Sequence, residues 1–239
     1  MDTFTAQVSR IDDLTRDVRV LTLRLVDPPV LRFEAGQFVS FHLDRPGARH
    51  PLTRVYSVAS PPGRDTEIEL LFNLVPRGPG STYLFGLRKG DRVRFKGPAG
   101  TFVLHEPLDR DLLFVATGTG IAPLRSMIHA AVAKTNRTIR LIWGVRGEED
   151  QYYQEELAAL AREYPNFSWV MTLSRPSAAW EGRIGYVQKI VREEVTSVDR
   201  LAVYVCGGSA MIEDVVAIVR RVGVCPIHRE QYYKDRPQP

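Results

Sequence analysis

Apolar and polar residues alternate in short runs over the first hundred residues of the chain. The run from Val18 to Leu25 is an example, and Asp27-Pro28-Pro29 ends it. A period of two is typical of β-strands, and breaks rich in Gly and Pro are typical of turns. Several such strands at regular spacing predict a small antiparallel β-barrel. The predicted strands cover residues 4–8, 18–25, 36–43, 54–60, 67–74 and 91–95.

The same region holds one short predicted helix, between residues 81 and 88. Residues 83–85 supply its apolar side. Ser81 is the expected N-cap, because its hydroxyl can accept a hydrogen bond from a free backbone N–H of the first turn. We also expect a turn at Arg45-Pro46-Gly47 and a loosely held tail at residues 234–239.

The pattern changes around residues 104–110, a polar connection that contains Pro107. We place a domain boundary there, with a first domain at residues 1–106 and a second at 107–239. In the second domain strands and helices alternate, which predicts a parallel sheet covered by helices. The predicted strands cover 111–116, 138–145, 167–173 and 201–206, and the predicted helices cover 122–134, 148–163, 186–194 and 209–222.

The composition narrows the class of protein. With 44% hydrophobic and 25% charged residues, the 239-residue chain has the balance of a soluble globular protein. It holds neither an apolar leader nor the roughly 20 apolar residues of a membrane helix. Its two cysteines, Cys206 and Cys225, are too few for a four-cysteine metal or iron–sulfur site. We therefore expect a cytoplasmic protein with no membrane segment and no metal site.

The charge pattern argues against one class of partner. The net charge is +4, and residues 1–110 hold 16 Lys and Arg against 13 Asp and Glu. A nucleic-acid-binding protein usually carries a basic stripe, and none is evident in the sequence. The slight excess suits either an acidic protein partner or an evenly solvated surface.

The stretch from Arg54 to Ser57 is the first candidate site. On a strand, the side chains of Arg54 and Tyr56 lie on one face and that of Ser57 on the other. Taken alone, the stretch is equally compatible with a strand that carries a salt-bridged arginine and a half-buried tyrosine.

A second candidate site follows the first strand of the second domain. The turn Thr117-Gly118-Thr119-Gly120 leads into a helix. Its glycines let the backbone approach a ligand closely, and the helix start offers free N–H groups to a pyrophosphate. Two other strand ends, at Ser174 and Cys206, are expected at the same edge of the sheet. The Gly-x-Gly-x-x-Gly fingerprint is absent, and Cys206 alone would also fit as a small buried residue.

Together these stretches resemble the ferredoxin–NADP reductase superfamily over nearly the whole chain. That family joins an FAD-binding antiparallel barrel to an α/β domain that binds a nicotinamide nucleotide, so the resemblance implies those roles for residues 1–106 and 107–239. The resemblance is carried by Arg54-x-Tyr56-Ser57, Gly78-Pro79-Gly80-Ser81-Thr82, Gly97-Pro98-Ala99-Gly100-Thr101-Phe102, Gly118-Thr119-Gly120-Ile121-Ala122-Pro123, Trp143-Gly144-Val145-Arg146, Ser174-Arg175-Pro176 and Cys206-Gly207-x-x-x-Met211.

The resemblance also implies a role for individual residues. Arg54 would pair with the FAD pyrophosphate, Tyr56 would lie against the isoalloxazine ring, and Ser57 would hydrogen-bond near flavin N5. Cys206 would sit near the nicotinamide, and Ser57, Tyr56 and Cys206 form the implied catalytic set. The other implied cofactor contacts are Val55, Leu74, Val75, Gly80, Ser81 and Thr82 for FAD, and Gly118, Thr119, Gly120, Arg146, Ser174, Arg175, Arg183 and Gly207 for the nicotinamide nucleotide.

Two further features bear on the cofactors. Members of the family often place an aromatic residue near the C-terminus over the flavin, and Tyr232 and Tyr233 are candidates; alternatively, both pack on the barrel. Arg146, Arg175 and Arg183 resemble contacts to NADPH, because arginine suits a 2′-phosphate. We expect NADPH, with NADH as the alternative, and Arg175 is the most informative of the three.

The resemblance implies a monomeric FAD enzyme that transfers hydride between NADPH and flavin N5 and exchanges electrons with a separate ferredoxin or flavodoxin. One alternative is the NADH-dependent reductase component of an oxygenase. Another is an NAD(P)H:flavin reductase. A third is an electron-transfer subunit without turnover of its own, although such subunits usually carry the iron–sulfur cysteines that this chain lacks.

Overall fold

The computed structural model describes residues 1–43 and 50–233, and the side chain of Tyr233 is not included. The turn predicted at residues 45–47 and the tail predicted at residues 234–239 lie outside this range. The chain divides into two compact units. The first is Met1–Leu104 with Arg125–Met127, and the second is His105–Leu124 with Ile128–Pro239.

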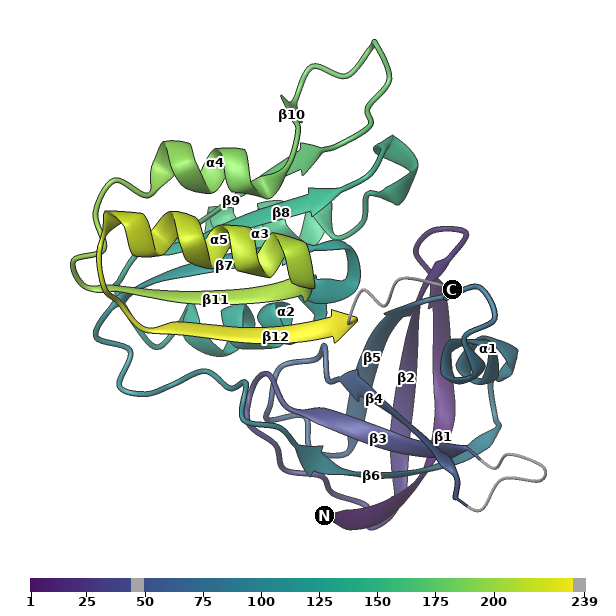
Figure 1. The fold of residues 1–239 in the computed structure, drawn as a ribbon. Coiled ribbons are helices and arrows are strands. Elements are labelled where there is room, and N and C mark those ends of the chain that lie inside the picture. The colour runs from purple at the N-terminus through teal and green to yellow at the C-terminus, as the bar shows by residue number, and fades with distance from the viewer. Residues whose placement is uncertain (44–49, 234–239) are drawn as a thin grey trace. The chain divides into compact units, whose positions relative to one another are not determined.

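The first unit is an antiparallel sheet of six strands in the order β4-β3-β6-β1-β2-β5 (Figure 1). The sheet curls until its two outer strands meet, through a bridge between Val58 and Leu70 and a 2.8 Å bond from Ala59 N to the oxygen of Glu69. The predicted antiparallel barrel is confirmed in this curled form. The strands are β1 (Asp2–Asp13), β2 (Val18–Asp27), β3 (Phe38–Leu43), β4 (Leu52–Ser57), β5 (Glu67–Asn73) and β6 (Arg92–Ala99).

The core of the first unit follows from the alternation in its strands. Phe4 of β1 stacks on Phe95 of β6 with ring centroids 5.5 Å apart, and Phe41 of β3 packs against Phe95 at 5.8 Å. All three rings are buried, as are Leu21 and Leu23 of β2. Burial of each such side chain contributes roughly 1.5–3 kcal/mol, so the inner faces of the strands hold the barrel closed.

The short helix of this unit begins earlier than the sequence suggested. Helix α1 covers Pro79–Gly86, with Gly78 as N-cap and no side-chain cap. The prediction of Ser81 as N-cap is wrong, because proline suits the first helical position and starts the helix two residues upstream. The Ser81 hydroxyl accepts from the N–H of Val75 at 3.0 Å and donates to the oxygen of Gly78 at 3.1 Å. It therefore holds the loop before the helix.

The second unit is a parallel sheet of six strands in the order β10-β9-β8-β7-β11-β12, with helices on both faces. Helices α4 and α5 lie together on one face, in front in Figure 1, and α2 and α3 lie behind the sheet. The predicted α/β class is confirmed. The elements are β7 (Asp111–Thr117), η1 (Gly118–Gly120), α2 (Ile121–Ala131), β8 (Ile139–Val145), η2 (Glu148–Asp150), α3 (Gln154–Glu163), β9 (Phe167–Leu173), β10 (Arg183–Ile184), α4 (Val187–Glu194), β11 (Leu201–Gly208), α5 (Ser209–Val222) and β12 (Ile227–Tyr233).

Strand β12 was not predicted. It pairs in parallel with β11, from Ile227 opposite Val203 to Tyr233 opposite Gly208. The segment that the sequence suggested as a possible cover for the flavin is thus an outer strand of the second sheet. Its run of polar residues lacks the alternation of apolar and polar positions by which the other strands were predicted.

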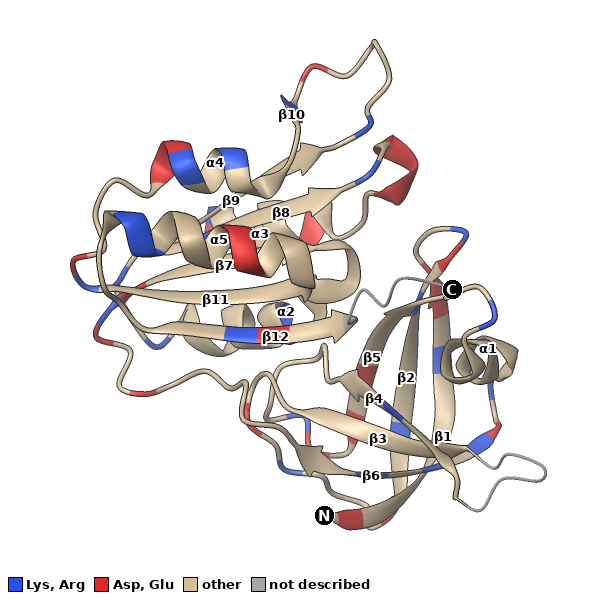
Figure 2. Ribbon diagram, in the orientation of Figure 1, with Lys and Arg blue, Asp and Glu red and all other residues tan. Residues whose placement is uncertain are grey.

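Charged residues of both signs are distributed over both units. Figure 2 shows Lys and Arg interspersed with Asp and Glu on the elements of both units, in keeping with the net charge of +4. Among the helices of residues 1–43 and 50–233, none is both long and apolar enough to cross a membrane.

Candidate cofactor sites

A cavity of about 320 Å³ opens at the carboxyl ends of the parallel strands in the second unit. Strands β7 and β11 are neighbours there, although the chain runs from β7 to β8 on the opposite side, so the cavity lies at the switch point where α/β sheets bind ligands. The predicted residues that line it are Gly118, Thr119, Gly120, Arg146, Ser174, Gly207 and Tyr232.

The glycine turn after β7 is shaped by close backbone approach. A Cβ on Gly120 would lie 2.3 Å from the carbonyl oxygen of Cys206, so only glycine lets η1 pass this close to β11. The indole N–H of Trp143 donates to the oxygen of Gly118 at 3.0 Å. Gly118 has φ of +51°, and a Cβ there would meet nothing within 4 Å. The turn is therefore held by the hydrogen bond from Trp143, and the Cα of Gly118 faces open space.

Cys206 is buried, and its neighbours Gly207 and Gly208 line the cavity. Burial raises the pKa of the Cys206 thiol well above its usual value. The carboxylate of Glu230 on β12 adds to this rise in pKa, and a hydrogen bond with the Tyr232 side chain opposes it. The thiol is thus protonated near neutral pH.

This burial predicts very different reactivity for the two cysteines. Cys225 is partly exposed, although burial also raises its pKa. At pH 8 a disulfide reagent should label one thiol per native chain, at Cys225, because only thiolates react and Cys206 is covered. Labelling should accelerate as pH rises toward the raised pKa. The Cys225→Ser variant should give no rapid labelling until it is denatured; rapid labelling of native Cys225→Ser protein would show that Cys206 is accessible.

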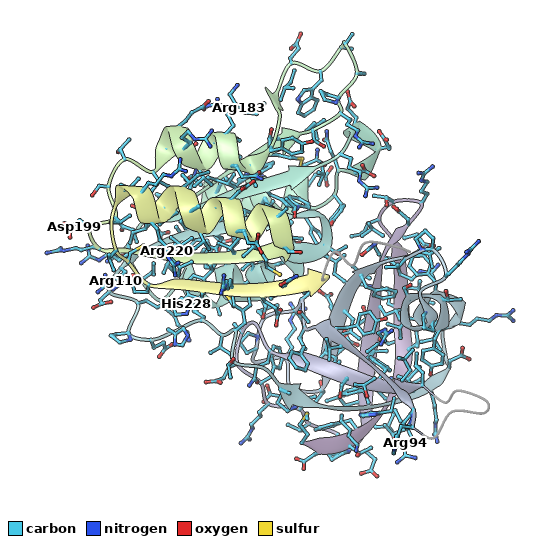
Figure 3. The ribbon with its side chains drawn as sticks, in the orientation of Figure 1. Arg94, Arg110, Arg183, Asp199, Arg220 and His228 are labelled. Atoms are coloured by element: carbon cyan, nitrogen blue, oxygen red, sulfur yellow. The ribbon has the colours of Figure 1, made fainter. Side chains whose placement is uncertain are left out.

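Two of the three predicted arginines, Arg146 and Arg175, are joined by a backbone hydrogen bond, and Arg146 lines the cavity. The N–H of Arg175 donates to the oxygen of Arg146 at 2.7 Å, and the N–H of Ser174 donates to the oxygen of Val145 at 3.1 Å. Both arginines are exposed, and within the described residues neither forms an ion pair. Arg183, which Figure 3 labels, by contrast donates to Glu193 of α4 at 2.9 Å. The backbones of Arg146 and Arg175 are therefore bonded to each other, whereas the side chain of Arg183 is paired with an acidic residue.

The sequence reasoning missed Tyr186. It lines the cavity just before α4, and 69% of its surface is exposed. A large exposed aromatic side chain beside a cavity suits stacking on a flat ligand. The sequence signal was a tyrosine directly after Gly185, but we interpreted it as the first residue of a helix.

The first unit gathers the other predicted residues around β4 and α1. On β4, Arg54 and Val55 are exposed, Tyr56 is half-buried and Ser57 is buried. Within the described residues Arg54 forms no ion pair, and its guanidinium donates to the oxygen of Thr53 at 2.8 Å. The salt-bridged arginine that we considered as the alternative is not seen in this part of the chain.

Strand β4 and the start of α1 are in direct contact. A Cβ on Gly80 would lie 2.6 Å from the hydroxyl oxygen of Tyr56 and 2.7 Å from Cγ of Arg54. Leu74 and Val75 lie in the loop before α1, and the Ser81 hydroxyl bonds to the Val75 N–H. Thr82 lines an open cavity of about 680 Å³ along α1. Arg54, Tyr56 and Gly80 are therefore neighbours, and the loop that holds Val75 is bonded to the same helix.

Comparison with known proteins identifies the class. A model of the oxidoreductase FAD-binding domain matches residues 5–104, and one of the oxidoreductase NAD-binding domain matches residues 114–217. The chain is thus an oxidoreductase with an FAD-binding and an NAD(P)-binding part.

Individual relatives are similar over most of their length. Ferredoxin--NADP reductase B of Sorangium cellulosum is 36% identical over 240 residues, which are 98% of this chain and 97% of that protein. The ferredoxin--NAD(P)(+) reductase component of the naphthalene 1,2-dioxygenase/salicylate 5-hydroxylase systems of Ralstonia is 34% identical over 95% of this chain and 68% of its own. A crystal structure of an Amycolatopsis cytochrome P450 reductase is 33% identical with a TM-score of 0.86, covering 97% of this chain and 70% of the other. The chain belongs to the ferredoxin–NADP reductase superfamily.

Proposed function

We propose that the protein transfers hydride between NADPH and the N5 atom of FAD and exchanges electrons with a separate ferredoxin or flavodoxin. The observation that carries the choice of NADPH is a pair of exposed arginines joined by a backbone hydrogen bond: Arg146, which lines the cavity, and Arg175 beside it. The choice of a ferredoxin-type partner is supported by the Sorangium relative, a ferredoxin–NADP reductase that matches the chain almost end to end.

The residues of the first unit fit FAD, and we assign the cofactor to residues 1–106. The guanidinium of Arg54 and the free N–H groups at the start of α1 would hold the pyrophosphate. Gly80 fits this role because its lack of a side chain leaves the N–H groups reachable beside Arg54 and Tyr56. Tyr56 would cover the isoalloxazine ring, and Ser57 would hold a hydrogen bond near N5.

We assign the nicotinamide nucleotide to residues 107–239. The backbone from Gly118 to Gly120 would bind its pyrophosphate, and Arg146 and Arg175 would bind the 2′-phosphate as charge-assisted donors. Tyr186 would stack on an aromatic part of the nucleotide. Gly207 would leave room for the nicotinamide beside Cys206, whose protonated thiol is a neutral neighbour. The flavin accepts two electrons as hydride and releases them one at a time, so the protein's own contribution is to position the two cofactors.

Rapid reduction of the flavin by the two nucleotides tests this proposal. We expect NADPH to reduce the bound FAD at far lower concentration than NADH. Arg175→Asp should raise the NADPH concentration needed for half-maximal rate by about ten- to a hundredfold, because a charged hydrogen bond of roughly 1.5–3 kcal/mol is lost. The requirement for NADH should change little.

Arg183→Asp is the matched control, because it changes the charge by the same amount at an arginine that is already paired with Glu193. It should leave the NADPH requirement nearly unchanged. A wild-type preference for NADH would instead support a second candidate function, an oxygenase reductase component, which the Ralstonia relative favours. Failure to reduce added ferredoxin or flavodoxin with NADPH would contradict the proposed partner.

A further inference from the structure

Helix α1 has little stability of its own. It is eight residues long, it contains two glycines, and its N-cap makes no side-chain hydrogen bond. Helices this short are marginal in isolation, and glycine is among the poorest helix formers. The last turn also holds no basic residue that would balance the negative end of the helix dipole. The order of α1 must therefore come from contacts with the rest of the barrel.

Arg19 of β2 supplies what the last turn lacks. Its guanidinium donates to the carbonyl oxygen of Phe85 at 2.7 Å, and its central carbon lies 4.5 Å from the centre of the Phe85 ring. Nε and Nη2 donate to the two carboxylate oxygens of Asp13 at 2.6 and 3.1 Å. Only 14% of the Arg19 side chain is exposed. A donor for a free carbonyl and a cation over a ring thus act on the same turn, and the bonds to Asp13 fix the guanidinium in place.

The contact continues from Phe85 toward the candidate FAD site. The Phe85 ring meets Phe72 of β5 edge-to-face at 5.5 Å, and Phe72 meets Tyr56 of β4 edge-to-face at 5.5 Å. Tyr56 in turn adjoins Gly80 in the first turn of α1. The two ends of α1 are therefore fixed against the barrel, one by Arg19 and Phe85 and the other by β4.

We infer that Arg19 is a positioning residue for FAD, which holds α1 by its last turn so that the first turn can bind the pyrophosphate. This inference rests on the proposed function, which assigns the pyrophosphate to the start of α1. Arg19 acts through the helix, because its contacts are with Asp13 and Phe85 and not with the first turn.

In the test, FAD is removed from the full chain and then titrated back, and flavin fluorescence measures the Kd for FAD. Arg19→Ala should raise the Kd for FAD by about tenfold or more, since it removes the hydrogen bond and the cation–π contact that hold Phe85 of α1. In the FAD-loaded variant, the 31P resonances of the pyrophosphate should move toward those of free FAD. A residue that only stabilised the barrel would not shift them. Arg19→Lys keeps the charge but loses the planar fork, so we expect a smaller rise in Kd.

Arg10→Ala is the control, because Arg10 lies on the adjacent strand β1 and also forms ion pairs, with Asp12 and Glu69. It should change neither the Kd nor the 31P resonances. An unchanged Kd in Arg19→Ala, or a raised Kd with unshifted 31P resonances, overturns the inference. If Arg19→Ala does not fold, Arg19→Lys and Phe85→Leu decide by the same two measurements. A wild-type protein that binds FAD with no 31P shift would instead refute the assignment of the pyrophosphate to α1.

Discussion

Replacing Arg54 with alanine should weaken FAD binding by about ten- to a hundredfold and leave the first unit folded. Arg54 is exposed on β4, and in the described residues its guanidinium bonds only to the oxygen of Thr53, so the fold loses little with it. A charged hydrogen bond to a phosphate contributes roughly 1.5–3 kcal/mol, and each 1.4 kcal/mol is a factor of about ten in affinity. Fluorescence titration of the FAD-free protein measures the change.

Arg94→Ala gives the matched control. Arg94 is an exposed arginine on β6 of the same barrel, labelled in Figure 3, and its removal changes the net charge by the same amount. We expect its Kd for FAD to stay within about twofold of the wild type, since surface charges act weakly at a distance. Equal weakening in both variants would mean that overall charge, and not a contact from Arg54, attracts the cofactor.

Replacing Gly120 with alanine should lower the free energy of unfolding of the second unit by about 3 kcal/mol. The new Cβ would lie 2.3 Å from the carbonyl oxygen of Cys206 and 2.8 Å from its carbonyl carbon. Both atoms belong to the backbone of β11, so the turn or the strand must shift, and overpacking of this kind costs about 1–3 kcal/mol or more. Urea denaturation measures the loss. Calorimetry should also show weaker binding of NADP⁺, because the turn lines the cavity.

Gly208→Ala separates this clash from the general effect of adding a methyl group. Gly208 lines the same cavity, but a Cβ there meets nothing within 4 Å, and its φ of −73° suits any residue. We expect its stability to change by no more than about 0.5 kcal/mol. If the two variants were equally destabilised, close approach of η1 to β11 would not be the reason for glycine at position 120.

Much of the fold could be predicted because most strands carry their own signal. The alternation in β2 and the apolar run in β7 reflect burial on one face or on both. Strand β12 carries no such signal, since His228, Arg229 and Glu230 interrupt its apolar residues. It is a strand because β11 offers a partner, and pairing between segments that are distant along the chain cannot be read from local sequence.

The parts of the candidate site that depend on local backbone geometry could be predicted from the sequence. The parts that depend on packing between distant segments could not. The glycines of η1 mark a close approach, so the turn could be located from sequence. The burial of Cys206 depends on β12, which we did not predict. The ion pair between Arg183 and Glu193 depends on how α4 packs beside β10, which the local sequence does not specify. Similarly, Ser81 holds the loop because α1 starts at Pro79.

The order of strands in the second unit also bears on how the protein behaves in concentrated solution. Outer strands have unpaired backbone groups that can template growth of a sheet from one molecule to the next. At one margin, β10 is only two residues long, too short to guide another chain. At the other, β12 carries Arg229 and Glu230 in mid-strand, and an incoming strand would have to pair or desolvate these charged side chains. Both margins therefore discourage fibrillar aggregation.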